Sequence, residues 1–498
     1  MSDNKPNILL IMTDQQRYDS LGCYGFKAAH TPNLDRMAEE GVLFENTYVN
    51  NTICTPSRAS IHTGKHLPGH GVYKLHDILP EDEVLFTKRL QDRGYQTALF
   101  GKLHVSGRIY EENQRHPNDG FDIYEWCMEP SLNLDVEHNG YGRWLEEKHP
   151  EFYKELKEKG RDLLHIPREN HMNHWAAERT IDFIENREDE RPFFVEMSVF
   201  DPHNPYEDYP EEMLDLIDED KIPVPVYKEG EMKGKPAGVL REHEHSYLGN
   251  FKDFTSDDIM KMRKGYHASI ALIDLEIGRV LKALEEKGIA DNTLVIFVSD
   301  HGDMLGDHQL SVKGAFFYDS CTKVPLIIRW SEKIKENKII SALVQPHDLA
   351  ATILAAAGYD QNKLQEVMPA SVDLMPLIQG NINKVHEYAI CCYRNTGISD
   401  QGVYFDPEIN ATMIRDERYK LNIYHDTTDS GVIEGELYDM KEDPLEFNNL
   451  WDNPEYLDIR LKLTDQLLNW SINQEIKKGS RGGETVPDSS QQLVNKLK

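Results

Sequence analysis

The stretch Asn7-Ile8-Leu9-Leu10-Ile11-Met12-Thr13-Asp14-Gln15 decides the fold that we expect for this chain of 498 residues. It holds a short apolar run that polar residues end abruptly, a pattern typical of a buried strand. Further runs rich in β-branched or aromatic residues follow, separated by long helical patterns, at Thr97–Phe100, Phe193–Phe200, Thr293–Val298 and Val324–Trp330. Strands that alternate with helices in this way predict an α/β fold built on a doubly wound sheet.

Start and stop signals bound several helices between these runs. Proline in the first turn and glycine just after the last turn are typical helix boundaries. The predicted helices are one that Thr31 and Pro32 open and Gly41 stops, one over Asp257–Lys287 before Gly288, and one over His347–Ala357.

The pattern changes after Gly380. Short strands are expected at Thr412–Arg415, Arg418–Tyr424 and Glu436–Met440, followed by a helix near Asn453–Ile472. We therefore predict a larger N-terminal domain over residues 1–380, a smaller C-terminal α+β subdomain over 381–475 and a tail over 476–498. The last stretch, Lys477–Lys498, has the composition of a mobile tail or of an arm that becomes ordered on a partner.

Composition limits the kind of partner. The chain has 55 Lys and Arg against 86 Asp and Glu, which gives a formal charge of −31. Such an excess of acid repels nucleic acids and anionic membrane surfaces, so neither is expected to bind. An anionic substrate would have to meet a local cationic site.

The cysteines and the first residues indicate the compartment. The six cysteines show no pair of C-x-x-C spacings: Cys23, Cys54, Cys127, Cys321, Cys391 and Cys392. Neither a disulfide framework nor a zinc ribbon is therefore expected, and a reducing compartment is the default. The first apolar run is too short for a secretory or membrane-spanning segment. We expect a cytoplasmic protein, unless a leader has been removed, and leave a homo-oligomer open.

Polar clusters follow four of the predicted strands. The carboxyl ends of parallel strands form the ligand-binding edge of such sheets. Alone, each of these residues would be an ordinary turn, cap or surface residue, but four clusters at one edge favour a site. Asp14, Gln15, Asp300 and His301 offer mainly oxygen ligands for a divalent cation. Lys102, His104 and His203 offer positive charge and proton carriers for an anionic substrate.

A fifth element is the segment Cys54-Thr55-Pro56-Ser57-Arg58-Ala59-Ser60-Ile61-His62-Thr63-Gly64. Pro56 is expected to be the first helical residue, which places Cys54 beside a helix N-terminus that favours anions. Cys54 next to Arg58 is then a candidate thiolate nucleophile. The alternative is a buried, inert cysteine.

The pattern C-x-P-S-R-x-x-x-x-T-G in this segment resembles the signature of the type I sulfatases, in which a maturation enzyme oxidises the cysteine to formylglycine. The resemblance also covers the four strand ends, Lys313-Gly314, Leu437-Tyr438-Asp439 and Asp443-Pro444-Leu445-Glu446, and so nearly the whole chain. It implies an alkaline-phosphatase-like sandwich with a large, mixed and mostly parallel sheet between helices. It also implies a four-stranded antiparallel sheet and a helix in the C-terminal subdomain.

The resemblance also implies a role for each matching residue. Residue 54, as a formylglycine hydrate, would be the nucleophile and a metal ligand, with Asp14, Gln15, Asp300 and His301 completing the metal shell. Arg58 would hold the hydrate, and Lys102 and Lys313 would bind sulfate oxygens. His203 would lie near the leaving-group oxygen, and His104 would take the second hydroxyl proton of the hydrate.

The expected metal is Ca²⁺. Some members of the family have Asp in place of Gln15 and Asn in place of His301, so this ligand set is less acidic, and Mg²⁺ and Mn²⁺ are alternatives. His62, His66 and His70 are not part of the motif. We expect them on a solvated helix and loop surface, the alternative being that one of them contacts the substrate.

The function that we expect is hydrolysis of a sulfate monoester on a sulfated mono- or oligosaccharide. Sugar specificity is assigned to the polar loops Trp126–Trp144, His165–Trp175 and Pro223–Phe254. One alternative is a phosphonate monoester or phosphodiester hydrolase of the same superfamily, although these enzymes tend to lack the Lys and His found here as Lys102 and His104. A non-catalytic anion- or glycan-binding protein and a cysteine hydrolase with an unmodified thiolate are less favoured by these residues.

Overall fold

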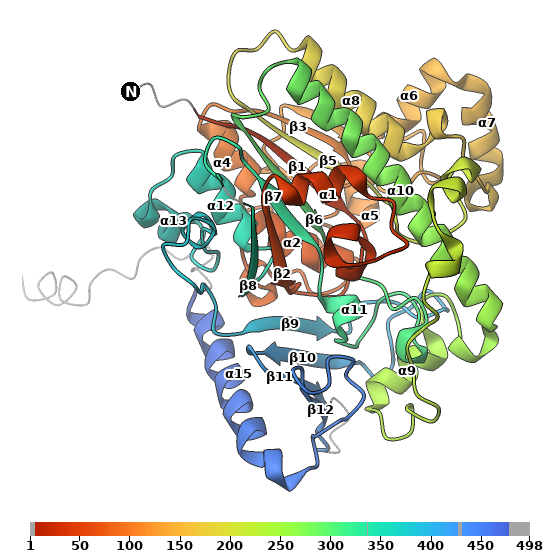
Figure 1. Ribbon diagram of the computed structural model, residues 1–498, viewed down its shortest axis with the longest axis vertical. Helices are drawn as coiled ribbons and strands as arrows, with labels where there is room; N and C mark the ends of the chain where they lie inside the picture. The colour runs from red at the N-terminus through yellow and green to blue at the C-terminus, as the bar shows by residue number, and fades with distance from the viewer. Residues whose placement is uncertain (1–4, 336, 427–430, 478–498) are drawn as a thin grey trace, which may run out of the picture.

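The computed structural model describes residues 5–335, 337–426 and 431–477, and it confirms an α/β fold with two sheets (Figure 1). The large sheet has eight strands in the order β4-β3-β5-β1-β6-β7-β2-β8. Their bounds are β1 Asn7–Thr13, β2 Val42–Thr47, β3 Gln96–Gly101, β4 Ile123–Trp126, β5 Phe193–Ser198, β6 Thr293–Ser299, β7 Leu326–Arg329 and β8 Lys338–Val344. The sheet is mixed and mostly parallel, because β7 alone of these strands runs antiparallel to its neighbours β6 and β2.

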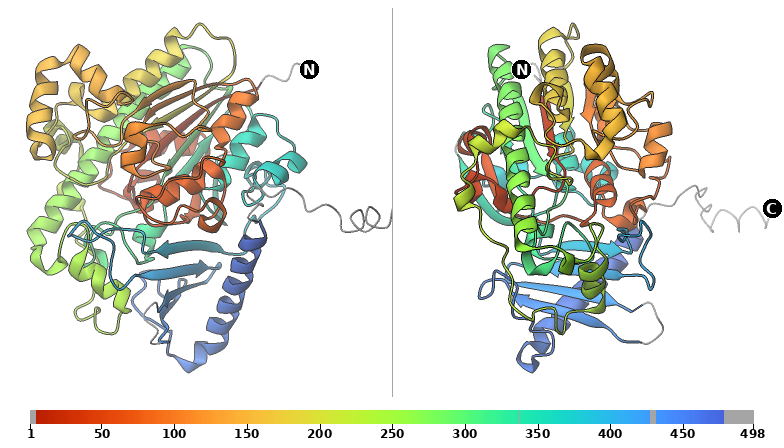
Figure 2. Two further views of the ribbon diagram at one scale, coloured as in Figure 1. Left: turned by 180° about the vertical axis from the view of Figure 1, so that it is seen from behind. Right: turned by 90° about the vertical axis from the view of Figure 1, so that its right-hand side faces the viewer.

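Helices cover both faces of this sheet (Figures 1 and 2). The bounds are α1 Pro32–Glu39, α2 Cys54–Thr63, α3 Leu67–His70, α4 Phe86–Asp92, α5 Arg108–Asn113, α6 Gly140–Lys148, α7 Pro150–Lys159, α8 Met172–Asn186, α9 Ala237–His245, α10 Ser256–Glu286, α11 Asp319–Thr322, α12 Asp348–Ala356, α13 Gln361–Val367, α14 Met375–Ile378 and α15 Leu457–Lys477. The helices predicted from Thr31, Asp257 and His347 are thus confirmed as α1, α10 and α12.

Alternation along β1 explains why the sheet is buried on both faces. Ile8, Leu10 and Met12 belong to the hydrophobic core on the side of α2, α4 and α12. Leu9 and Ile11 belong to the core on the side of α1, α8 and α10. All five side chains are fully buried. Because successive strand residues point to opposite faces, an unbroken apolar run is what a central strand of a three-layer structure requires.

The second sheet is smaller and antiparallel, in the order β12-β11-β10-β9. Its strands are β9 Ala389–Arg394, β10 Asn410–Arg415, β11 Tyr419–His425 and β12 Glu434–Asp439. Helix α15 runs along it (Figure 2) and packs Leu463, Leu467 and Trp470 against the apolar side chains of the strands. The division of the chain at residues 380 and 475 stays a prediction, and 478–498 of the predicted tail lie outside the described residues.

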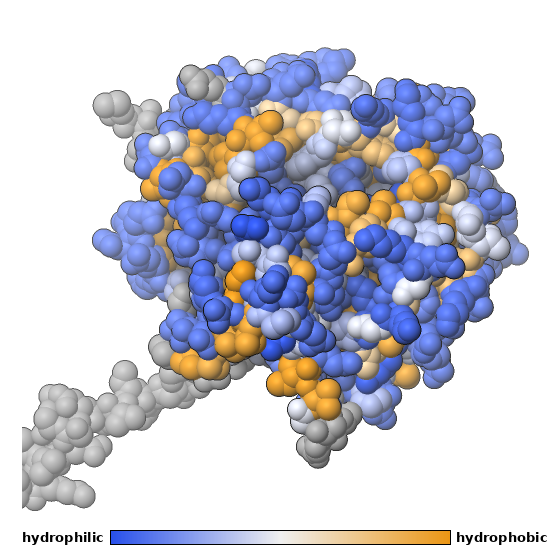
Figure 3. All heavy atoms as spheres, turned by 60° about the horizontal axis from the view of Figure 1, so that its bottom comes forward, coloured by the Kyte–Doolittle hydropathy of each residue, from blue (hydrophilic) through white to orange (hydrophobic). Residues whose placement is uncertain are grey.

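Several details differ from the sequence-based expectation. Strand β5 ends at Ser198, two residues before the predicted end, and β2, β4, β8 and β9 were not predicted. All six cysteines lie in the described part of the chain, and none forms a disulfide. Of the helices in that part, none has the length and apolar character needed to cross a membrane. Hydrophilic side chains cover most of the face shown in Figure 3, with apolar ones in separate patches.

Candidate active site

The predicted site residues meet at one edge of the large sheet. Strands β1 and β6 are parallel neighbours with Thr13 opposite Ser299, so Asp14 and Asp300 leave the sheet side by side. Strands β3 and β5 pair Gly101 with Ser198, and Lys102 and His203 follow these two strands. The sheet register therefore brings together residues that are far apart in the sequence, such as Thr13 and Ser299, which are 286 positions apart.

Asp14, Asp300 and His301 form a group that could hold a metal ion. One ligand atom from each of these buried residues lies within 4.8 Å of the others. Asp14 Oδ1, His301 Nε2 and Gln15 Oε1 are buried and have no hydrogen-bond partner in the described residues. Buried polar atoms are rarely left without partners, so these orphaned oxygens and nitrogen fit a divalent cation.

The neighbours of these ligands orient them correctly for an ion. His301 Nδ1 lies 3.0 Å from the carbonyl oxygen of Gly302. A carbonyl only accepts, so Nδ1 carries the proton, and Nε2 keeps a lone pair for a metal. The amide nitrogen of Gln15 donates to Asp303 Oδ2 at 2.5 Å, which points Oε1 of Gln15 away from that carboxylate.

Arg58 and Lys102 balance the two aspartates. Arg58 is fully buried, its Nε donates to Asp300 Oδ2 at 2.6 Å, and its Nη2 lies 3.5 Å from Asp14 Oδ2. Lys102 Nζ is ion-paired with the same oxygen of Asp14. Burial alone would raise the pKa of Asp14, but Lys102, Lys313, His203 and Arg58 hold it well below its usual value. Asp14 is therefore ionised, as a metal ligand must be.

Cys54 lies at the start of α2 and is 3% exposed. The helix begins at Cys54 itself, two residues before the predicted start at Pro56, so that prediction was wrong. The backbone of Cys54 and Thr55 already adopts the helix, and the unpaired N–H groups of the first turn lie at the cysteine. Burial raises the pKa of the thiol, but Lys102 and Lys313 outweigh that effect and lower it.

His104 is held as a neutral base. Its Nε2 lies 2.9 Å from Thr55 Oγ1, and that hydroxyl donates to the carbonyl of Leu75. Thr55 therefore accepts from His104, which puts the proton of the imidazole on Nε2 and leaves Nδ1 as a lone pair. Nδ1 is buried without a partner in the described residues. Burial, Lys102 and Arg58 lower the pKa of His104 well below its usual value.

His203 has the opposite ring orientation. Its Nδ1 lies 2.6 Å from the carbonyl oxygen of Asn204, so Nδ1 carries a proton and Nε2 is the atom that can exchange one. Burial and Lys313 lower the pKa of His203 well below its usual value. An anion bound between His203 and Lys313 would raise that pKa again, because it opposes both effects.

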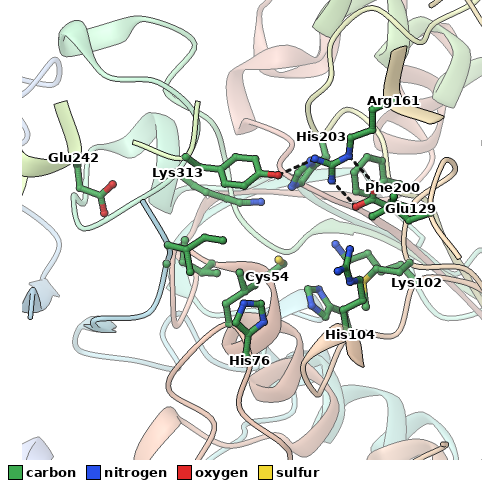
Figure 4. A pocket seen from close by; sticks show the side chains of 18 residues that line it. Cys54, His76, Lys102, His104, Glu129, Arg161, Phe200, His203, Glu242 and Lys313 are labelled. Atoms are coloured by element: carbon green, nitrogen blue, oxygen red, sulfur yellow. Dashed lines mark hydrogen bonds and ion pairs between the residues drawn. The ribbon is translucent and has the colours of Figure 1, made fainter. Parts of the chain in front are cut away.

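These side chains line a cavity of about 450 Å³ (Figure 4). Cys54 lies at its floor with Lys102, His104, His203 and Lys313 around the sulfur. The remaining lining residues are Ile53, Leu75, His76, Arg108, Met128, Glu129, Leu132, Arg161, Phe200, Glu242, Tyr247, Gly397 and Ile398. Arg58, Asp14, Gln15, Asp300 and His301 are fully buried and are not among the lining residues.

The expectations about specificity loops and histidines are only partly met. Two of the three proposed loops reach the cavity, through Met128, Glu129 and Leu132 and through Glu242 and Tyr247, but 165–175 does not. Several lining side chains are apolar, although the loops were judged polar. The prediction of a solvated surface for His62, His66 and His70 was wrong, because they are 0, 8 and 0% exposed. None of the three lines the cavity, so substrate contact is not supported either.

His76, Arg108, Arg161 and Ile398 line the cavity but were not predicted. They come from a loop, the start of α5, the turn after α7 and the turn after β9. No motif marks these positions, because only the packing of distant segments brings them to the rim.

A second buried cluster, His171, Asp201 and Asp208, has metal-like spacing but the wrong tautomer. The backbone N–H of Asn173 donates to His171 Nδ1 at 3.2 Å. Neutral His171 therefore carries its proton on Nε2, the atom that would have to bind the ion. The hydrogen bonds of the histidines thus distinguish the two clusters. Of the two, the cluster of Asp14, Asp300 and His301 suits a metal.

Comparison with known families gives two matches. The sulfatase family model matches residues 6–359. The model for the C-terminal part of N-sulphoglucosamine sulphohydrolase matches residues 306–473. Together they span both sheets.

The chain is similar to several enzymes. It is 33% identical over 372 residues to an arylsulfatase of Clostridium perfringens, covering 70% of this chain and 74% of that protein. It is 28% identical over 511 residues to an N-acetylglucosamine-6-O-sulfatase of Bacteroides thetaiotaomicron, covering 91% and 84%.

Solved structures agree over almost the full length. A phosphonate monoester hydrolase of Agrobacterium radiobacter superposes with a TM-score of 0.75 at 25% identity, covering 94% of this chain and 96% of that one. A protein solved in complex with its substrate, D-glucosamine-2-N,6-O-disulfate, superposes with a TM-score of 0.73 at 25% identity, covering 95% and 98%.

Proposed function

This chain belongs to the sulfatase family and is a sulfuric ester hydrolase, and from that premise we propose that it releases sulfate from a sulfated mono- or oligosaccharide. One observation carries the proposal: Lys102, Lys313, His104 and His203 surround Cys54 at the floor of a cavity wide enough for a sugar. The relatives that act on sulfated glucosamine support the sugar as substrate class. We also propose a cytoplasmic location, because the number and spacing of the cysteines are not those of a disulfide framework.

Asp14, Gln15, Asp300 and His301 would hold the divalent ion, together with residue 54. Three of the four offer oxygen, which favours Ca²⁺ over softer metals and leaves Mg²⁺ and Mn²⁺ as alternatives. Such an ion supplies positive charge beside the transferring sulfate. The orphaned atoms of Asp14, Gln15 and His301 support this assignment.

Cys54 would be converted to formylglycine by a maturation enzyme. The sequence from Cys54 to Gly64 supports this modification through its resemblance to the family signature. The hydrate of that aldehyde supplies an attacking hydroxyl and a second hydroxyl whose deprotonation frees sulfate by C–O cleavage. Arg58, fixed by Asp300 and by the carbonyl of Lys102, would hold the hydrate in place.

Lys102 and Lys313 would bind the sulfate oxygens. Lys313 Nζ is 3.9 Å from Asp14 Oδ1 and has no hydrogen-bond partner in the described residues, so its donors are free for an anion. Negative charge moves toward the bridging oxygen as the ester breaks. The two ammonium groups would stabilise the transferring sulfate, while the charge on the bridging oxygen is met by the proton donor His203.

The two histidines divide the proton transfers. His203 Nε2 would donate to the departing sugar oxygen once the bound sulfate has raised its pKa. His104 Nδ1, neutral and without a partner in the described residues, would take the proton of the second hydroxyl. Their opposite tautomers, set by Asn204 and by Thr55, support these opposite roles.

The cavity also offers surfaces that suit a sugar ring. Tyr247 is 37% exposed, and its hydroxyl accepts from Arg161 Nη1 at 2.9 Å, which fixes the ring. Arg161 is itself held by Glu129 through two hydrogen bonds of 2.9 and 2.6 Å. A fixed aromatic ring beside apolar walls suits the C–H face of a sugar, since the ring presents area at little entropic cost.

A phosphonate monoester or phosphodiester hydrolase is the second candidate, because an enzyme of that activity superposes closely. The experiment is to measure product release from sulfated sugars, an aryl sulfate and a phosphonate monoester. The protein would be co-expressed with a formylglycine-generating enzyme. We expect sulfate release to dominate by at least about 100-fold in kcat/KM, a difference of about 3 kcal/mol in transition-state binding. Preferential phosphonate cleavage would overturn the proposed substrate class.

A further inference from the structure

Glu242 is a buried acid in the wall of a cavity otherwise rich in cations. It lies on α9, is 3% exposed and lines the cavity with Lys313 (Figure 4). Glu129, the other acid of the lining, is paired with Arg161. No lysine, arginine or histidine of the described residues forms an ion pair with Glu242. A buried carboxyl without a cation is costly, so its presence in the cavity wall calls for an explanation.

The fold holds this carboxyl firmly by one oxygen. Glu242 Oε1 accepts from the backbone N–H of Ala315 at 2.8 Å and from the hydroxyl of Tyr393 at 3.1 Å. A Cβ on residue 314 would lie 2.6 Å from the carboxyl carbon, so only glycine permits this approach. Glu242 Oε2 accepts no hydrogen bond from the described residues, and it is not among their buried unpaired atoms. It therefore lies open to the cavity.

The surroundings of Glu242 Oε2 determine which ligand groups it prefers. Burial raises the pKa of Glu242 to about 7, so the carboxyl becomes charged near neutral pH. A carboxylate accepts hydrogen bonds only, and it attracts an ammonium while repelling a second anion. The cations Lys102 and Lys313 at the floor have the opposite preference. The cavity is thus polarised, with one end suited to sulfate and one wall suited to hydrogen-bond donors.

We propose that Glu242 Oε2 recognises a hydroxyl or ammonium group on the sugar that carries the sulfate, and that it disfavours a second anionic group at that position. The substrate class is then a sulfated sugar with a free hydroxyl or amine next to this wall. The inference rests on the proposed function and deepens it. Glu242 is a specificity residue, since it contacts the sugar and not the sulfur.

The test compares Glu242→Gln with Glu244→Gln. Glutamine keeps an oxygen for Ala315 and Tyr393 but presents an N–H₂ to the cavity where Oε2 was. Glu244 is exposed on the same helix and outside the cavity, so its replacement makes the same change of charge without the change in the wall. kcat and KM are measured on three substrates: the amino sugar sulfate that the wild type cleaves best, its N-sulfated counterpart, and 4-nitrophenyl sulfate.

For Glu242→Gln we expect KM for the free amino sugar to rise about 10-fold or more, because one charge-assisted hydrogen bond is lost. In the same variant, kcat/KM for the N-sulfated sugar should rise relative to kcat/KM for the free amino sugar. For 4-nitrophenyl sulfate, kcat/KM should stay within about 3-fold of wild type, because this ester has no hydroxyl or ammonium group to donate to Glu242. Equal changes on all three substrates, no change, or the same shift in Glu244→Gln would overturn the inference. Wild-type protein that releases sulfate from no sugar would instead refute the proposed function.

Discussion

At the residue scale, hydrogen-bond partners decide what each histidine of the site can do. His301, His104 and His203 all lie within the active-site group, yet their free atoms differ. Nε2 is free in His301 and His203, and Nδ1 is free in His104. A carbonyl or hydroxyl neighbour fixes each tautomer, so the proposed metal ligand, base and acid can lie together without exchanging roles.

The metal group gives the first prediction. His301→Ala should lose the bound divalent ion and reduce kcat/KM by about 10²-fold or more, since ligand loss removes both the ion and its charge. Asp208→Asn, in the second cluster, should keep one ion per chain. Metal content is measured by mass spectrometry after loading with Ca²⁺ and gel filtration. Full activity of metal-free wild-type protein would contradict the assignment of Asp14, Gln15, Asp300 and His301.

The second prediction concerns His104. His104→Ala should reduce steady-state turnover by about 10²- to 10⁴-fold, because it removes the proposed acceptor of the second hydroxyl proton. In the proposed mechanism, release of the alcohol in the first step does not need His104. Rapid mixing with an aryl sulfate should then show about one equivalent of alcohol per modified active site before the slow phase. A loss of that first release as well would assign His104 to the first step.

His104 also gives a prediction for the pH dependence of kcat. A base must be unprotonated, and the pKa of His104 is lowered well below its usual value by burial, Lys102 and Arg58. The basic form therefore persists as the pH falls below about 6.5, and the acid limb of the kcat profile should lie below the ordinary range of histidine. An acid limb near the ordinary value would show that substrate binding has cancelled the effect of the neighbours.

Most residues of the site were predictable because they follow apolar runs directly. Asp14, Asp300 and Lys102 come immediately after β1, β6 and β3, where the sequence itself marks the strand end. Glu242 and Arg161 were not predictable as individual residues. They reach the cavity from a helix and a turn whose sequences carry no mark of that position, and only tertiary packing selects them.

At the element scale, α15 illustrates how one helix carries both a buried and an exposed apolar stripe. Leu463 is fully buried against the small sheet, whereas Leu461 on the same helix is 52% exposed. Leu463→Ala should lower the free energy of unfolding by about 2–5 kcal/mol, the cost of a cavity in a packed core. Leu461→Ala should change it by about 0.5 kcal/mol or less. Urea unfolding followed by circular dichroism measures both, and equal effects would show that α15 is not docked as described.

Two of the strands that sequence reasoning missed, β4 and β8, share a physical cause. Strands β4 and β8 lie at the two edges of the large sheet, and their burial is mixed. An edge strand needs no unbroken apolar run, so it lacks the signal that marked β1 and β6. Strands β1, β5 and β6 were predicted, because burial on both faces constrains nearly every residue in them.

At the scale of the whole molecule, the fold is the alkaline-phosphatase-like sandwich that the resemblance implied, and the second sheet extends it. Its strand order places β1, β5 and β6 at the centre. The four polar clusters lie close together because the strands that they follow are neighbours in that order. The catalytic edge is thus a property of the whole sheet. No single segment, including the one from Cys54 to Gly64, contains more than part of it.

The net charge of −31 gives the last prediction. The substrate is an anion, so the distant acids repel it while Lys102 and Lys313 attract it at contact distance. Monovalent salt screens charges beyond a Debye length, about 30 Å at 0.01 M and about 10 Å at 0.1 M, so the repulsion is weakened first. Raising KCl from about 0.01 to about 0.15 M should increase kcat/KM about two- to fivefold, and more for a disulfated than for a monosulfated sugar. A fall in kcat/KM over this range would mean that the local cations dominate the field even at long range.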